Sequence, residues 1–212
     1  QEIEKRCRAF FWTGQDTVTG GNCKVAWDIV CAPFTNGGLG FLSLTQMNVC
    51  LLLKHISKLH DGAASRQPSY LVSKYGWSST HDVGTDDSHS TPIWRDIMKG
   101  LDFFRSNTRV QLGNGATTSF WLDLWLPNTT QTLAQLFPAL FSHSNRIHTP
   151  VARALGSNNL TLDLTPRLSH TAECELFDLR NVLANVNLEV ADKRISREAG
   201  KPLTTKLAYQ AV

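Results

Sequence analysis

The sequence lacks the features that would place the chain in a membrane or outside the cell. No run approaches the roughly 18 consecutive apolar residues of a membrane span, and residues 1–5 contain no apolar signal-peptide region. The five cysteines are an odd number and form no CxxC motif, which is not the pattern of a disulfide framework. We therefore expect an intracellular protein of the nucleus or cytoplasm, neither secreted nor membrane-bound.

Charge is also scarce. Only 18% of the 212 residues are charged, and 21 Lys and Arg against 18 Asp and Glu give a net charge of +3. This weak positive charge permits a nucleic-acid partner without requiring one. Apolar residues make up 42% of the chain, which is enough for a buried core and too much for a disordered tail.

Motifs for catalysis and metal binding are missing as well. There is no P-loop or nucleophile elbow, and the glycines of residues 37–40 suit a tight turn better than a dinucleotide site. Cys50, His55 and His60 are five residues apart, and such steps rotate by about 140° on a helix, so the three would not share one face. The neighbours of Asp86–Asp87 are Ser, Thr and His, which predicts a solvated loop rather than a pair of metal-binding aspartates. We expect no catalytic residue, no metal site and no small-molecule substrate.

Hydrophobic periodicity predicts helices along most of the chain. Ser43 and Gln46 form a capping box at the start of one of them, and Thr91-Pro92 opens another. Glycine permits the tight turn expected at 36–40. The predicted helices span residues 3–12, 24–31, 43–60, 69–75, 91–101, 130–137, 149–155, 172–186 and 203–212.

One segment carries a clear β signal. Residues 109–112 and 117–121 are short alternating runs on either side of Asn114-Gly115, the pattern of a β-hairpin. The predicted fold class is therefore mainly α, a helical connector with one small β-hairpin near 109–121.

Basic residues recur on two of the predicted helices and at the entry to the hairpin. Lys54 and Lys58 are one helical turn apart, and more cations follow around Trp94. Such a stripe could track a phosphate backbone, or it could be the solvated face of ordinary helices. The candidate nucleic-acid-binding residues are Lys54, Lys58, Arg95, Lys99, Arg105 and Arg109.

Several motifs occur together in a fixed order. They are RAFFWTG at 8–14, VAWDIVCAP at 25–33, GGLG at 37–40, NVCLLLK at 48–54, IWRDI at 93–97, LGNG at 112–115, FWLDLWL at 120–126 and FPALF at 137–141. Their order and spacing resemble the region downstream of the polymerase core in plant LINE-type (non-LTR) retrotransposon reverse transcriptases.

This resemblance implies a division of the chain. Residues 1–12 would be the end of a thumb-like helix, 13–146 a helical connector, and 147–212 a linker with the start of a zinc-binding-domain-like segment. In that family the catalytic aspartates would precede Gln1 and the zinc ligands would follow Val212. The resemblance thus implies no catalytic residue, metal ligand or cofactor in this chain, although the parent polyprotein uses magnesium and a downstream zinc site.

The resemblance also suggests a role. It implies a non-catalytic fragment that helps to bind an RNA/DNA template–primer or to position neighbouring domains. One alternative is a helical scaffold without nucleic-acid contact, whose cations would be scattered over the surface. Another is a decayed transposon remnant, consistent with Phe34 and Ile195 standing where the family often has Lys and Trp.

Overall fold

The computed structural model describes residues 2–60, 66–75, 90–156, 160–184, 186–188 and 191–211. These residues form two compact units, 1–51 and 52–211, with the boundary inside helix α3. The predicted loop with Asp86–Asp87 lies outside the described residues. No helix in the described part of the chain is both long and apolar enough to cross a bilayer.

Unit 1 is built from short helices around an aromatic group. It contains α1 (Glu2–Thr13), η1 (Gly20–Asn22), α2 (Trp27–Cys31), η2 (Phe34–Asn36) and the first half of α3 (Leu44–His60). The Phe11 ring contacts three aromatic rings edge-on, at centroid distances of 4.9 Å to Trp12, 5.8 Å to Trp27 and 5.1 Å to Phe41. This cluster, rather than a closed aliphatic core, holds α1 against α2 and the segment that precedes α3.

The turn predicted at residues 36–40 is confirmed. Gly37 and Gly40 have positive φ values of 79° and 65°. Gly38 has a different reason to be glycine, because a Cβ there would lie 2.0 Å from the carbonyl oxygen of Ala32. The turn returns the chain onto α2, and the amide of Leu39 donates to the carbonyl of Val30 at 3.0 Å.

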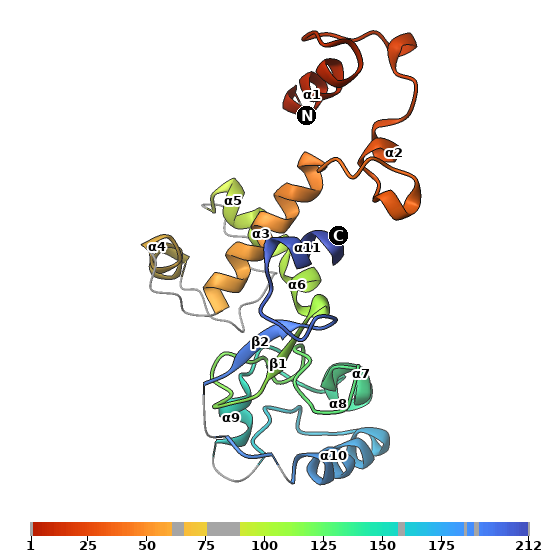
Figure 1. Ribbon diagram of the computed structural model, residues 1–212. Coiled ribbons are helices and arrows are strands. Elements are labelled where there is room, and N and C mark those ends of the chain that lie inside the picture. The colour runs from red at the N-terminus through yellow and green to blue at the C-terminus, as the bar shows by residue number, and fades with distance from the viewer. Residues whose placement is uncertain are drawn as a thin grey trace. The chain divides into compact units, whose positions relative to one another are not determined.

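Unit 2 carries the larger core. After the second half of α3, its elements are α4 (Arg66–Tyr75), α5 (Pro92–Lys99), α6 (Leu101–Asn107), β1 (Thr108–Gln111), α7 (Leu133–Leu136), α8 (Pro138–Ser142), α9 (Val151–Leu155), α10 (His170–Leu183), β2 (Lys193–Ser196) and α11 (Thr205–Ala211). Helix α8 packs against α7 and α10, and the core includes Phe120, Trp121, Leu133, Leu140, Val151 and Leu179 (Figure 1). Two of the buried indoles donate hydrogen bonds, Trp121 to Ser144 and Trp125 to the carbonyl of Phe120.

The mainly α class with one small antiparallel sheet is confirmed, but the predicted hairpin partner is wrong. Strand β1 pairs with β2, in the register Thr108↔Ser196 to Gln111↔Lys193, and not with residues 117–121. Thr118, Ser119 and Phe120 are instead buried in an irregular turn that bridges to Pro150. Figure 1 shows β1 and β2 side by side although they are far apart in the sequence.

Candidate functional site

Four of the six predicted cationic residues lie on two helices of unit 2, three of them exposed and one half-buried. The inward face of α3 buries Leu53 and Ile56, which leaves Lys54 exposed and Lys58 half-buried. In the same way α5 buries Trp94, Ile97 and Met98, and this turns Arg95 and Lys99 outward. Each pair is four residues apart, and residues at this spacing lie on one side of a helix. We call these four residues the α3/α5 cations.

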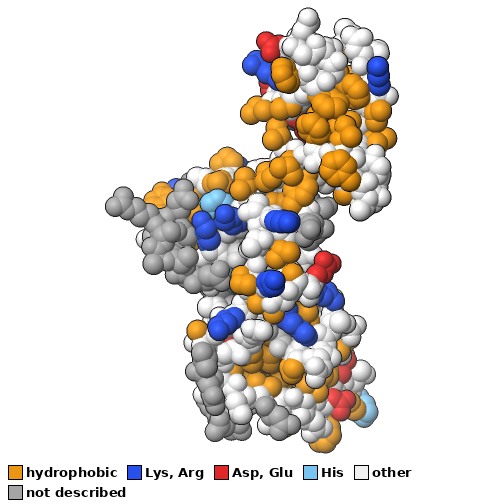
Figure 2. All heavy atoms as spheres, viewed as in Figure 1, with side chains coloured by type: hydrophobic (Ala, Val, Ile, Leu, Met, Phe, Trp, Pro, Cys, Tyr) orange, Lys and Arg blue, Asp and Glu red, His pale blue; other side chains and the backbone are white. Residues whose placement is uncertain are grey.

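The surface of unit 2 that carries basic side chains is of mixed character. Figure 2 shows separate Lys and Arg side chains over the middle of unit 2, with apolar and neutral surface between them. Lys99 is paired with Asp96 at 3.6 Å, and the two side chains are 77% and 51% exposed. An ion pair this exposed is weak, so the Lys99 ammonium can exchange Asp96 for another anion.

Arg109 lies on β1, and its side chain is hydrogen-bonded to backbone carbonyl groups. Its Nη2 donates to the carbonyl oxygens of Leu126, at 3.0 Å, and Thr129. The side chain therefore ties the loop after Trp125 to the strand. It is a structural residue here more than a free phosphate ligand.

Arg105 requires a correction. It was predicted on a solvent-facing stripe, but the residue is only 5% exposed and its Nε lies 3.7 Å from Oδ1 of Asp123. The reason is helical spacing, because α6 turns Leu101, Phe104 and Arg105 to the same buried side. A buried guanidinium held on a carboxylate cannot reach a phosphate backbone, so we remove Arg105 from the candidate interface.

Asp123 is the centre of a buried ion cluster with Arg105 and Arg194. Arg194, on β2, donates from Nη2 to Oδ2 at 2.8 Å and from Nη1 to Oδ1 at 3.1 Å, a two-pronged contact. The amide of Ser119 adds a third hydrogen bond at 2.7 Å. Burial by itself raises the pKa of Asp123, but the two guanidiniums outweigh it and hold the pKa below its usual value. The cluster joins α6, β2 and the turn at 119–123.

His60 borders the same cluster. Its ring stacks on Phe104 at 5.2 Å and 19°, and Arg194 lies over that Phe104 ring at 5.2 Å. Burial, reinforced by the charge of Arg194, lowers the pKa of His60 well below its ordinary 6.5. The end of α3 is thus anchored on α6 through a neutral imidazole.

Sequence reasoning missed a group of basic side chains near the C-terminal strand. Lys193, Arg197, Lys201 and Lys206 are exposed on and after β2, and Arg197 donates to the carbonyl of Thr130 at 3.1 Å. The signal was present in the composition, because residues 191–211 contain five Lys and Arg and only two Asp and Glu. That difference of three equals the net charge of the whole chain.

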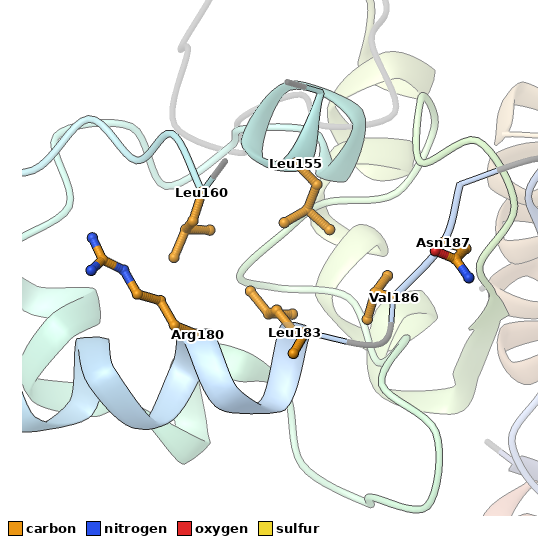
Figure 3. A pocket seen from close by; sticks show the side chains of 7 residues that line it. Leu155, Leu160, Arg180, Leu183, Val186 and Asn187 are labelled. Carbon is orange, nitrogen blue, oxygen red and sulfur yellow. The ribbon is translucent and has the colours of Figure 1, made fainter. Parts of the chain in front are cut away.

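A pocket of about 640 Å³ lies between α9 and α10. Figure 3 shows Leu155, Leu160 and Leu183 around it, with Arg180 of α10 at its edge. Among the described residues that line it, only Arg180 and Asn187 have polar side chains, and none is a nucleophile, acid or base. In the part of the chain that the structure describes, no three His, Cys, Asp or Glu side chains gather around a possible metal position.

Comparison with known proteins identifies two relatives, both from Arabidopsis thaliana. The chain is 31% identical over 110 residues to the "Uncharacterized mitochondrial protein AtMg00310", a match that covers 50% of this chain and 70% of that protein. It is 26% identical over 140 residues to the "Putative ribonuclease H protein At1g65750", covering 58% of this chain and 20% of that protein. The chain thus corresponds to about one fifth of the second relative. No protein-family model and no solved structure matches the chain.

Proposed function

Because the chain belongs to the same family as that uncharacterized mitochondrial protein of Arabidopsis thaliana, we propose that it is a non-catalytic segment of a plant retrotransposon reverse transcriptase. The segment would follow the polymerase core of a LINE-type protein and help to hold its RNA/DNA template–primer. The ordered motifs from residue 8 to residue 141 support this family assignment.

The second relative supports a nucleic-acid context. Its name describes a ribonuclease, and the chain matches only a fifth of its length. A ribonuclease acts on RNA, so a segment shared with such a protein is expected to work beside a nucleic acid. The observation that carries the proposal within this chain is the outward position of the α3/α5 cations.

The chemistry of such contacts is electrostatic. Lys54, Lys58, Arg95 and Lys99 would each neutralise a backbone phosphate and release a condensed counterion. Contacts of this kind position a strand but do not read its sequence. Arg105 and Arg109 would act indirectly, by holding α6 and β1 in the fold that presents the two helices.

Filter binding of the full chain to an RNA–DNA hybrid at increasing salt tests the proposal. We expect binding at low ionic strength that weakens steeply with salt. The fourfold variant K54Q/K58Q/R95Q/K99Q should reduce the slope of log K against log [salt] by about 3, at roughly 0.7 to 0.9 per lost contact.

The matched control removes the same charge elsewhere in unit 2. The variant K74Q/R153Q/R167Q/R180Q changes four exposed cations on or near α4, α9 and α10, and it should keep most of the binding and the salt slope. Equal losses in both variants, or no binding at low salt, would contradict the proposal. A polymerase assay with Mg²⁺ should show no nucleotide incorporation, and clear incorporation would overturn the non-catalytic assignment.

An interaction module is the second candidate function, and one observation favours it. Unit 1 exposes large apolar side chains, among them Ile3 at 69%, Phe10 at 71% and Phe34 at 76%. A pocket of about 440 Å³ lies beside Phe10 and Phe11, lined also by Trp27 and Phe41. Such surface is typical of protein contacts. This function predicts no binding to the hybrid at any salt concentration.

A further inference from the structure

The LGNG motif opens a loop in which several hydrogen-bond donors converge on one carboxylate. The amides of Gly113 and Gly115 both donate to Oδ1 of Asp192 at 2.8 Å. The other oxygen, Oδ2, accepts from the amide and the hydroxyl of Thr117, each at 3.0 Å, and from the hydroxyl of Thr118 at 2.8 Å. Five neutral donors from six consecutive residues therefore surround a single anion.

The loop is shaped for this task. Gly115 has a φ of +69°, and a Cβ there would lie 2.7 Å from the amide nitrogen of Ala152, so only glycine fits. Asn114 stabilises the turn by accepting a hydrogen bond from the amide of Ala116 at 3.0 Å. Successive amides that point into one concavity form an anion-binding nest. We call residues 113–118 the LGNG nest.

Asp192 comes from 74 to 79 residues further along the chain. It directly precedes β2, and β2 pairs with β1, the strand that leads into the nest. Pairing of β1 with β2 therefore brings Asp192 next to the LGNG nest. Burial alone raises the pKa of Asp192. The hydrogen bonds from the nest outweigh burial and hold the pKa of this carboxyl below its usual value.

The donor set exceeds what a carboxylate needs. A carboxylate has two oxygens with about four acceptor positions, whereas the LGNG nest offers five donors. A phosphate group has three terminal oxygens and suits backbone amides combined with hydroxyls. We propose that the LGNG nest is a phosphate-binding site that Asp192 occupies in cis.

Removing the Asp192 side chain tests this proposal in the full chain. We expect phosphate, compared with chloride at equal ionic strength, to stabilise D192A against thermal unfolding. At a phosphate concentration ten times its Kd, the folding equilibrium constant should rise about elevenfold. Wild type should respond little, because its nest is filled.

Two further variants make the result specific. D163A removes a carboxylate that is 48% exposed and paired with Arg146, and its response to phosphate should equal that of wild type. D192A/T118V loses a buried hydroxyl donor and should lose most of the phosphate stabilisation of D192A. Equal stabilisation of all four proteins, or of D192A and D192A/T118V, would overturn the proposal. If D192A is unfolded in chloride, refolding by phosphate supports the proposal, and failure to refold contradicts it.

The source of the phosphate is resolved by adding oligonucleotides. Stabilisation of D192A by a 5′-phosphorylated oligonucleotide, but not by its unphosphorylated form, assigns the nest to a nucleic-acid end. Stabilisation by inorganic phosphate alone assigns it to free phosphate. If neither ligand stabilises D192A, the LGNG nest is only a receptor for Asp192 and the proposal fails. None of these outcomes depends on the hybrid binding proposed for the α3/α5 cations.

Discussion

The two units of the chain differ in how many of their apolar side chains are exposed and how many are buried. Among the described residues, unit 1 exposes ten large apolar side chains and buries three apolar residues. Unit 2, which is much longer, exposes five and buries 23. Burial of apolar surface is the main stabilising contribution to folding. The contrast indicates that unit 2 has most of the stability.

Charged groups follow the same contrast. In unit 1, Lys5 and Glu2 form an ion pair at 4.0 Å with both side chains 73% exposed. In unit 2, the Asp123 side chain is fully buried and holds two arginines whose side chains are 5% and 6% exposed. Exposed pairs contribute little, whereas breaking a buried pair leaves charge in a medium that cannot solvate it. Unit 2 is therefore the more sensitive to loss of a single charge.

The largest expected effect comes from opening the buried ion cluster. Asp123→Ala leaves Arg105 and Arg194 buried without their carboxylate and should lower the free energy of unfolding by about 3 to 5 kcal/mol. Urea denaturation followed by tryptophan fluorescence measures this change. The matched Glu2→Ala should cost no more than about 1 kcal/mol. Comparable losses from the two changes would remove the electrostatic part of the contrast.

Leucine truncation tests the apolar part. Leu140 is 0% exposed in the core of unit 2, so Leu140→Ala should cost about 2 to 5 kcal/mol in the same denaturation experiment. Leu42 of unit 1 is 58% exposed, and Leu42→Ala should change stability by no more than about 0.5 kcal/mol. A large loss for Leu42→Ala would mean that unit 1 buries this side chain in solution, against a partner or a second copy.

The smallest expected effect is a pH dependence confined to unit 2. His60 has a lowered pKa in the folded chain, so the unfolded chain takes up a proton first as the pH falls. Stability should be constant above about pH 6.5 and decrease below it by up to about 1.4 kcal/mol per pH unit, until the folded pKa is reached. Residues 1–51 contain no histidine, so hydrogen exchange in unit 1 should show no such trend.

Two substitutions check the assignment to His60. His60→Phe keeps a ring stacked on Phe104 and should abolish the slope between pH 6.5 and the folded pKa. His170→Phe changes an exposed histidine on α10 and should leave the slope as it is. A slope that survives His60→Phe would assign the pH dependence to another group.

The helices were predictable because their signals are local. The helix expected at 43–60 is α3 (Leu44–His60), with the side chain of Ser43 accepting from the amide of Gln46 at 3.4 Å. The helix expected at 149–155 is α9, and the broader prediction at 130–137 is α7, now bounded at Leu133–Leu136. The outward position of Lys54, Arg95 and Lys99 follows from the same periodicity. A spacing of three or four residues is visible without knowledge of the rest of the chain.

The pairing of β1 was not predictable in this way. Its partner β2 lies about 85 residues away, and Asn114-Gly115 gave a complete local explanation for a hairpin. That dipeptide instead builds the LGNG nest, whose ligand Asp192 is equally remote in the sequence. Arg105 could have been placed correctly, because it shares one helical side with Leu101 and Phe104. Whether the α3/α5 cations bind phosphate stays a prediction until binding is measured.

The Arg194–Asp123 contact can form only late in synthesis of the chain. The two residues are separated by 71 positions, so a ribosome adding about 5 to 20 residues per second needs about 4 to 14 s between them. During that interval the nascent Asp123 carboxylate has Arg105 but not Arg194, and β1 lacks its partner strand β2. Unit 2 therefore completes its buried ion cluster only after β2 has been synthesised.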